Sequence, residues 1–281
     1  MLPGSHWRLA VLLGGLIFAA ACSEPRPSSN GPAQVVPAGF LSATRLAAGL
    51  EEGWLELLER GLAEGLSPSV IGTDTNRLLI VEIDPARFEP VLYTTPGSGI
   101  PALTALEDNA AALVIGSGFV TEAHSLAPVG LLQHEGTVLN PVQVHGYTRI
   151  LGINDQGIGV VHRKDFQRGL FHSAMQVGPG IVEAGRLDIS ERDLKRPRYF
   201  RSFIAVCRDR WIAGVSLAPS HLRTLGETFL QYAETQALDC GEVVNLAGDR
   251  QAVLVMATSA ATFTHGDPNT HKLSLIGFTH R

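Results

Sequence analysis

The segment FIAVC-RDR-WIAGVSL, residues 203–217, shows most clearly how this chain folds. Two apolar runs, 203–207 and 211–217, flank a charged triplet, and this pattern predicts a β-hairpin. A helix should follow, because residues 225–237 carry an apolar stripe at helical spacing. Thr224 and Glu227 have the spacing of a capping box at its start, and Gly241 is expected to end it.

On both sides of this hairpin, the sequence predicts many strands and few helices. Pro90 places the strand 88–93 at a sheet edge, since proline cannot donate to a ladder. Other helices are expected over 54–66 and 101–109, and a loop or exposed single turn over 190–198. The remaining strands are expected over 78–83, 111–115, 143–152, 157–162, 174–177, 243–246, 253–257 and 273–279. This content predicts an α+β fold in which a mixed β-sheet is flanked by a few helices.

The N-terminal residues read as an export signal. Arg8 is followed by a continuous apolar run and then by Ala19-Ala20-Ala21-Cys22, which resembles a bacterial lipoprotein signal with Cys22 as the acylated residue. The run is too short for a membrane-spanning helix. An ordinary signal that leaves Cys22 as a free thiol is the alternative. Ser23 in place of Asp favours the outer membrane, so we expect a lipid-anchored protein facing the periplasm of a bacterial cell envelope.

Composition divides the chain into three parts. Residues 1–22 form the signal and lipidated cysteine, 23–37 are a Ser-, Pro-, Gly- and Asn-rich flexible tether, and 38–281 form one domain. The formal net charge of −5 comes without any basic run typical of nucleic-acid binding. The expected partners are therefore the membrane, through the lipid, and an envelope molecule. Cys207 and Cys240 could form a disulfide in an oxidising compartment or remain as two buried thiols.

Three glycine-centred turns follow apolar strands, at residues 116–119, 178–180 and 245–249. Glycine permits positive φ and close backbone approach, so amides in such turns can bind an anion or a sugar hydroxyl. Each turn by itself is equally typical of an ordinary tight turn. Ser117 is not the nucleophile of a serine hydrolase, because its surroundings lack the Gly-x-Ser-x-Gly frame.

In their order along the chain, these turns resemble the phosphodiester glycosidase family, which includes the uncovering enzyme that removes N-acetylglucosamine from a phosphodiester. The resemblance runs from about residue 78 to residue 257. Family members typically read Asn-Gly-Gly-Phe-Phe, Ser-Gly-Pro, Arg-Thr and Asn-Leu-Asp-Gly-Gly at four places. This chain reads GSGFV at 116–120, VGP at 177–179, RS at 201–202 and NLAGD at 245–249.

The resemblance implies a substrate that combines a sugar with a phosphate. Arg201 would hold the phosphate, because a guanidinium matches phosphate geometry, although an ordinary ion pair is the other interpretation. Asn245 would contact the sugar. The implied substrate-binding residues are Gly116, Ser117, Gly118, Gly178, Pro179, Asn245 and Gly248.

Two departures from the family pattern bear on catalysis. Ala247 stands at the acidic position, and a methyl group can neither bind a cation nor move a proton; Gly116 stands where the family has Asn. Asp249, two residues beyond Ala247, is the candidate replacement, so Arg201 and Asp249 are the expected catalytic pair. Glu122 and Asp155 are weaker candidates.

The ten histidines give no metal-site spacing of the helix or hairpin type. His265 and His271 flank Asp267 in a loop compatible with a weak ion site, although solvated or core histidines fit the pattern better. The sequence requires no cofactor, and a divalent cation remains possible. The expected function is hydrolysis or binding of a sugar phosphate or cell-envelope glycan; the alternative is a non-catalytic envelope-binding or scaffold lipoprotein that lost the carboxylate at Ala247.

Overall fold

The structure is a computed structural model of the chain in which residues 40–42, 55, 58, 60–95, 97–121 and 126–281 are described. The chain divides into two compact units, Met1–Val36 and Pro37–Arg281, and every described residue belongs to the second. The expected export signal, Cys22 and the tether lie outside the described residues.

Two large sheets build this unit, and the first has six strands. It runs in the order β1 (Phe40–Ser42), β18 (Thr262–His265), β17 (Leu254–Ala257), β6 (Ala111–Gly116), β20 (Ser274–His280) and β4 (Phe88–Thr94). The β1–β18 pair is parallel and its other pairs are antiparallel, so the sheet is mixed as predicted. The edge position expected from Pro90 is confirmed, because β4 is the last strand.

The second large sheet has seven strands and contains the predicted hairpin. Its order is β13 (Arg186–Leu187), β12 (Gly180–Glu183), β16 (Cys240–Asn245), β14 (Ser202–Cys207), β15 (Trp211–Ser216), β3 (Asn76–Ile83) and β2 (Leu66–Thr73). β14 and β15 pair antiparallel, with Val206 opposite Trp211. The hairpin expected around 208–210 is therefore confirmed.

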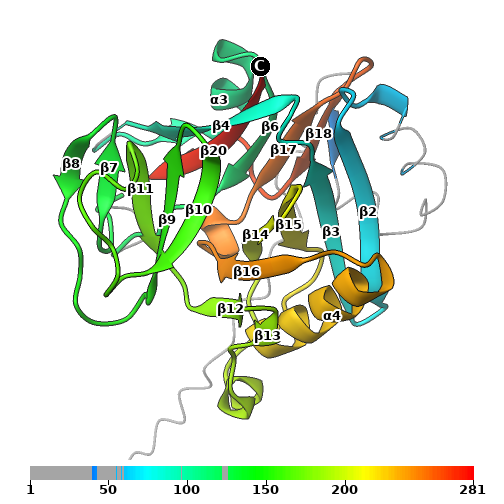
Figure 1. The fold of residues 1–281 in the computed structure, drawn as a ribbon. Helices are drawn as coiled ribbons and strands as arrows, with labels where there is room; N and C mark the ends of the chain where they lie inside the picture. The colour runs from blue at the N-terminus through cyan, green and yellow to red at the C-terminus, as the bar shows by residue number, and fades with distance from the viewer. Residues whose placement is uncertain (1–39, 43–54, 56–57, 59, 96, 122–125) are drawn as a thin grey trace, which may run out of the picture. The chain divides into compact units, whose positions relative to one another are not determined.

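Two smaller sheets complete the unit (Figure 1). The five-stranded sheet runs β10 (Gly157–His162), β9 (Arg149–Asn154), β11 (Ser173–Val177), β7 (Leu132–His134) and β8 (Thr137–Asn140). β5 (Ile100–Pro101) pairs with β19 (His271–Lys272). The strand expected over 143–152 begins only at Arg149, because residues 143–148 form a loop.

The main core lies between the two large sheets. β3 shows how one strand serves two cores, since successive side chains point to opposite faces. Leu79, Val81 and Ile83 join the cluster shared with β6, β17 and β20, whereas Leu78 and Ile80 join the cluster under the long helix. The unit therefore carries its own complete core, and we expect residues 37–281 to fold without the preceding segment.

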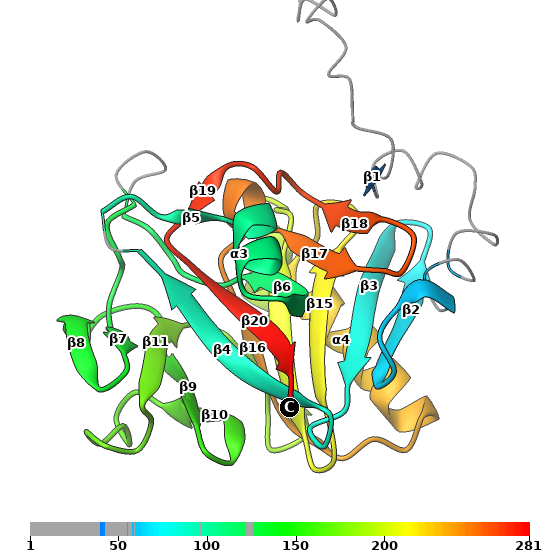
Figure 2. The ribbon, with the colours of Figure 1, turned by 90° about the horizontal axis from the view of Figure 1, so that it is seen from above.

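A helix covers the outer face of each large sheet. The short helix α3 (Ala102–Asp108) packs Ala105 and Leu106 against the six-stranded sheet. It confirms the helix expected over 101–109. The long helix α4 (Leu222–Thr235) packs Leu225 and Phe229 against the seven-stranded sheet. Figure 2 shows the two helices beside different sheets. No helix in the described part of the chain is long and apolar enough to cross a membrane.

The ends of α4 differ from the sequence prediction. The helix begins at Leu222, and the carboxylate of Asp193, in the 3-10 turn η1 (Glu191–Lys195), accepts a hydrogen bond from the Arg223 N–H at 3.0 Å. The predicted capping box is wrong, because Glu227 instead forms an ion pair with Arg223. Gly241 does not end the helix: the chain leaves it at Ala237, whose φ is +52°, and Gly241 lies in β16.

The helix expected over 54–66 is also corrected. Residues 55, 58, 60 and 61 are helical, whereas Leu66 begins β2. Residues 54, 56, 57 and 59 of the expected helix lie outside the described residues.

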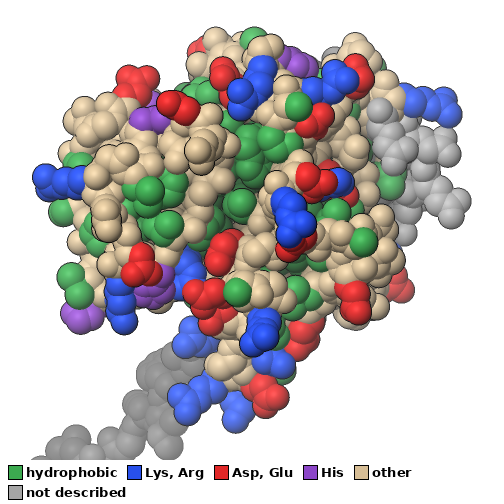
Figure 3. Space-filling model, in the orientation of Figure 1, with side chains coloured by type: hydrophobic (Ala, Val, Ile, Leu, Met, Phe, Trp, Pro, Cys, Tyr) green, Lys and Arg blue, Asp and Glu red, His purple; other side chains and the backbone are tan. Residues whose placement is uncertain are grey.

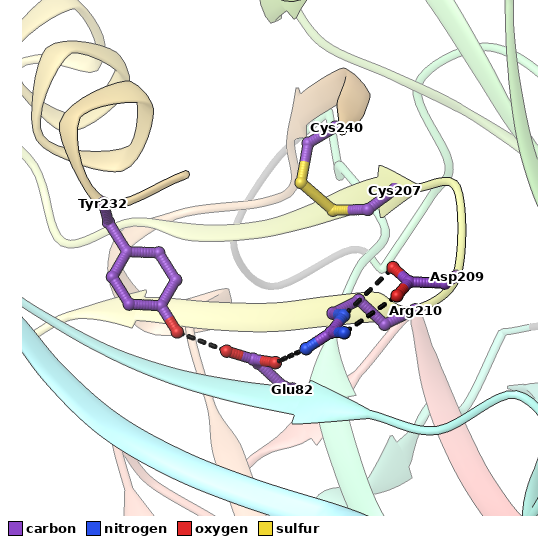
Figure 4. The surroundings of a disulfide bond; sticks show 6 residues. All are labelled: Glu82, Cys207, Asp209, Arg210, Tyr232 and Cys240. Carbon is purple, nitrogen blue, oxygen red and sulfur yellow. Dashed lines mark hydrogen bonds and ion pairs between the residues drawn. A yellow bond between two sulfur atoms is a disulfide. The ribbon is translucent and has the colours of Figure 1, made fainter. Parts of the chain in front are cut away.

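A disulfide joins two strands of the seven-stranded sheet, and an ionic network ties α4 to the same sheet (Figure 4). Cys207 of β14 and Cys240 of β16 are bonded. Glu82 of β3 accepts a hydrogen bond from the Tyr232 hydroxyl of α4 and forms an ion pair with Arg210. Burial and the neighbouring Glu82 carboxylate raise the pKa of Tyr232, so its hydroxyl remains a hydrogen-bond donor.

Candidate functional site

The three glycine turns and Arg201, far apart in sequence, meet at one end of the large sheets. The Gly178 N–H donates to the Asn245 carbonyl at 3.0 Å, and the Asn245 N–H donates to the Pro179 carbonyl at 3.1 Å. The Ala247 N–H donates to the Ser117 carbonyl at 3.2 Å. The sequence order of the turns therefore translates into one spatial junction.

The polar side chains of this junction are buried and bond to the protein itself. Ser117 is 1 % exposed and its hydroxyl lies 3.2 Å from that of Ser274. The Ser202 hydroxyl donates to the Ala247 carbonyl at 2.6 Å. Asn245, 2 % exposed, donates through Nδ2 to the Gly178 carbonyl, while its Oδ1 has no partner within the described residues. Asn245 thus has almost no exposed surface with which to contact a sugar.

The glycines at the first turn are required by packing. A Cβ atom on Gly116 would lie 2.2 Å from the Gln251 carbonyl oxygen, and one on Gly118 would lie 2.3 Å from the Ser274 hydroxyl. Gln251 belongs to the 3-10 turn η2 (Asp249–Gln251), which begins at the last residue of the NLAGD motif at 245–249. The turn therefore fills the space that any side chain at position 116 would need.

Arg201 is the cationic group at the edge of this junction, and its guanidinium is largely uncommitted. Its Nε donates to the Ser220 carbonyl at 3.4 Å, and the guanidinium carbon lies 4.9 Å from the Tyr199 ring centroid. No ion pair to Arg201 exists among the residues that the structure describes. Burial lowers the pKa of Arg201, and the neighbouring Asp193 and Asp249 carboxylates oppose that shift.

Asp249 is brought to the same side as Arg201, close enough for their charges to interact. Its N–H donates to the Phe200 carbonyl at 3.0 Å, and its carboxylate accepts from the Phe200 N–H at 3.1 Å. The residue is exposed, with φ at +49°. Ala247, by contrast, is buried at 2 % exposure, so the lost carboxylate position faces the interior.

His265 is a neighbour of this site. The sequence placed it in a loop but favoured a solvated or core histidine over an ion ligand, and the core alternative is confirmed. It ends β18, is 7 % exposed, and its ring centroid lies 6.3 Å from that of Phe200. Burial lowers its pKa to about 4, a shift opposed by a hydrogen bond to the Ser216 backbone. The sequence signal for this position was the alternating pattern of residues 262–265, which is typical of a strand.

The other charged candidates lie elsewhere. Asp267 accepts hydrogen bonds from the Asn269 and Thr270 amides and so organises its own loop. No group of three or more metal-ligating side chains is found in the described part of the chain. Asp155 lines a cavity of about 260 Å³ with Glu89 and His172, apart from the junction residues. Glu122 lies outside the described residues.

Comparisons with known proteins support the fold. No family model matches the chain, and no curated protein matches its sequence. The catalytic domain of zebrafish N-acetylglucosamine-1-phosphodiester alpha-N-acetylglucosaminidase, solved in a form auto-inhibited by its pro-peptide, is similar in structure: the TM-score is 0.57 at 13% identity, over 77% of this chain and 82% of that one. A hypothetical protein from Synechocystis has a TM-score of 0.55 at 14% identity, over 77% of this chain and 62% of that one. The chain therefore has a phosphodiester-glycosidase-like fold, and the expected α+β class is confirmed.

Proposed function

We propose that the domain binds a phosphate-bearing sugar through Arg201. The observation that carries this proposal is the half-buried guanidinium of Arg201, which uses only Nε for a protein hydrogen bond and has no ion pair among the described residues. Its two terminal nitrogens are available for two parallel hydrogen bonds to a phosphate, the geometry that a guanidinium favours. Partial burial strengthens such bonds, because the local dielectric constant is lower than that of water.

Neighbouring groups fit the sugar part of such a ligand. The Tyr199 and Phe200 side chains are 39% and 38% exposed, so each presents aromatic surface beside Arg201. Aromatic rings offer apolar area with few rotatable bonds. The sugar would then lie against Tyr199 and Phe200, and Asn245 would act from beneath by holding the Gly178 turn.

Hydrolysis is a second candidate function, and it depends on Asp249. Glycoside cleavage commonly uses two carboxylates. Among the residues that the structure describes, Asp249 is the exposed candidate that interacts electrostatically with Arg201. A phosphate leaving group reduces the need for a general acid, because the cationic clamp stabilises its charge. Asp249 would serve as the nucleophile or base, and no cofactor is part of this proposal. A chain that binds without turnover is the outcome expected if Ala247 removed an essential group.

Binding can be tested by calorimetric titration of residues 37–281 with N-acetylglucosamine 1-phosphate. We expect Arg201→Ala to weaken binding by at least about tenfold. Arg201→Lys should restore part of the affinity, since lysine keeps the charge but cannot form the two parallel hydrogen bonds of a guanidinium. The matched control is Arg168→Ala, which removes an exposed arginine between β10 and β11. Equal affinity in wild type and Arg201→Ala would refute the assignment.

Turnover requires a separate assay on an aryl N-acetylglucosaminide and on an N-acetylglucosamine 1-phosphodiester. If Asp249 is catalytic, Asp249→Asn should abolish hydrolysis and leave binding of the sugar phosphate within about threefold. Binding without any hydrolysis by wild type would favour the non-catalytic function. Hydrolysis that survives Asp249→Asn would exclude Asp249 as the catalytic carboxylate.

We further propose that Cys22 carries a lipid that tethers the domain to the periplasmic face of the bacterial envelope, in the outer membrane. The support is the sequence pattern ending at Cys22. A tethered domain meets substrates within reach of residues 23–37, so an envelope glycan or sugar phosphate is the proposed partner.

A further inference from the structure

Residues 192–201, RDLKRPRYFR, form the most basic stretch next to the candidate site. Five of these residues are Lys or Arg and only Asp193 is acidic, although the whole chain has a net charge of −5. The Asp193 carboxylate is turned inward, because it is 8 % exposed and bonds to the start of α4. The outward-facing charge of residues 192–201 is therefore positive, and the exposed Glu191, which begins the same 3-10 turn, is the nearest acidic side chain before them in the sequence.

The cations of this stretch are exposed and unpaired. Arg192, Lys195, Arg196 and Arg198 are all solvent-exposed, and none has an ion pair among the described residues. Lys and Arg side chains gather at the lower end of the view in Figure 3, around the turn that follows β13, with some Asp and Glu side chains beside them. Unpaired cations in such a row attract a surface that carries many negative charges.

Apolar side chains are interleaved with these cations. Leu194, Tyr199 and Phe200 are exposed by 47%, 39% and 38%, and all belong to the same stretch. Leu194 stands between Arg192 and Lys195 in the sequence, so the basic stretch includes an exposed aliphatic side chain. We call residues 192–200 the basic-apolar loop.

The basic-apolar loop is held in place at three points. Asp193 bonds to Arg223 at the start of α4. Tyr199 and Ser220 exchange backbone hydrogen bonds of 3.3 and 2.8 Å, and Phe200 is bonded to Asp249. Because the backbone is fixed, the loop loses little conformational entropy when its side chains bind a surface.

We propose that the basic-apolar loop docks the domain on an anionic phospholipid surface. Interfacial binding combines Lys and Arg for acidic headgroups with an apolar side chain, here that of Leu194, for the boundary of the acyl chains. Leu194 decides between a bilayer and a soluble polyanionic glycan: it has no ring to stack on a sugar, whereas an acyl boundary accepts it. The long stems of the neighbouring cations can lie along the same boundary.

Docking in this way would place Arg201, at the end of the same stretch, beside the headgroups. If the proposed function is correct, the substrate would then be a sugar phosphate carried on a membrane lipid. Docking itself does not depend on Arg201, so the two proposals can fail separately.

The test is co-sedimentation of residues 37–281 with vesicles, so that no lipid anchor contributes. We expect binding to vesicles containing about one third phosphatidylglycerol and little binding to pure phosphatidylcholine, since each Lys or Arg near an acidic surface adds attraction. The triple variant Lys195→Gln/Arg196→Gln/Arg198→Gln should bind the anionic vesicles at least about tenfold more weakly. Leu194→Ser should also weaken binding without changing net charge.

The matched control removes three positive charges from another part of the surface, Arg163→Gln/Lys164→Gln/Arg168→Gln, and should bind nearly as well as wild type. Equal losses in the two triple variants would overturn the proposal, because the attraction would then follow net charge. It would also be overturned if wild type bound soluble poly(glycerol phosphate) through the loop but did not bind anionic vesicles. Titration with N-acetylglucosamine 1-phosphate should be unchanged in the loop variant, which separates docking from the function of Arg201.

Discussion

Individual residues at the junction divide into buried groups that hold the turns and exposed groups that can meet a ligand. Asn245, Ser117 and Ser202 belong to the first kind, because each is almost fully buried. Asn245 and Ser202 bond to neighbouring turns, and the Ser117 hydroxyl pairs with that of Ser274 in β20. The exposed Asp249 belongs to the second, and so does Arg201, whose half-buried guanidinium is partly accessible. A sequence motif cannot separate the two kinds, since both contribute polar residues at the ends of strands.

His265 should make stability depend on pH. Its pKa is about 4 in the folded protein and 6.5 as the ordinary value, so the unfolded chain binds the extra proton between these pH values. Its contribution is complete above pH 6.5 and is lost as the pH falls to 4, by an amount on the order of 3 kcal/mol. Urea unfolding at several pH values should show this slope in wild type and a smaller one in His265→Gln. His271→Gln, which changes an exposed histidine, should keep the wild-type slope; an equal change in both variants would contradict the assignment.

Gly116 gives a direct test of the packing around the η2 turn. Gly116→Ala places Cβ 2.2 Å from the Gln251 carbonyl oxygen, so we expect a loss of about 2–4 kcal/mol in the free energy of unfolding. Gly241→Ala is the control, because no atom lies within 4 Å of its added Cβ. That variant should be neutral or slightly more stable in the same denaturation assay. A neutral Gly116→Ala would mean that η2 does not fill this space.

At the scale of elements, the more apolar strands and the hairpin around residues 208–210 could be predicted, whereas helix ends and strands such as β2, β7, β8, β12 and β18 could not. The hairpin of β14 and β15 and the edge position of β4 follow from local signals, namely apolar runs and Pro90. The start of α4 depends on Asp193, which lies 30 residues before Arg223 and reaches it only in the folded chain. β2 was missed because its sequence, LSPSVIGT, is polar and broken by proline.

Asp193 should therefore stabilise the protein through α4. Asp193→Ala removes the acceptor of the Arg223 N–H, and such a loss at a helix start costs about 1–2 kcal/mol. Thermal unfolding of Thr224→Ala provides the comparison, since the predicted capping box is absent and that variant should lose less. A larger loss in Thr224→Ala would restore the capping box as the relevant contact.

The disulfide links β14 and β16 covalently, in addition to their backbone ladder. Cys207 and Cys240 are separated by 33 residues, and a closed loop of that size corresponds to about 3–4 kcal/mol of stabilisation in the chain-entropy view. Cys207→Ser/Cys240→Ser should lower the denaturant midpoint accordingly, and a reducing agent should have the same effect on wild type. A reducing agent that destabilises the double variant equally would show that another effect is responsible.

For the whole molecule, the fold could be predicted from the sequence, whereas the burial of individual motif residues could not. The resemblance in the glycine turns predicted the fold that the zebrafish catalytic domain shares. It could not predict which motif residues would be buried, because burial depends on contacts such as that between Gly116 and Gln251.

Attachment to the envelope is a property of the full chain. If Cys22 carries the lipid, Cys22→Ser should move the protein from the membrane fraction to the soluble fraction, because two or three acyl chains are what hold it firmly. Fractionation of bacterial cells, with Cys207→Ser/Cys240→Ser as the control for loss of other cysteines, tests this prediction. Retention of the Cys22→Ser variant on the membrane after a high-salt wash would contradict lipidation at that residue.

The most direct test of the central claim is a crystal structure of residues 37–281 with N-acetylglucosamine 1-phosphate. We predict that the phosphate lies within hydrogen-bond distance of the terminal nitrogens of Arg201, at about 2.7–2.9 Å, with the sugar against Tyr199 or Phe200. A phosphate bound elsewhere, with the Arg201 guanidinium still free, would contradict the account.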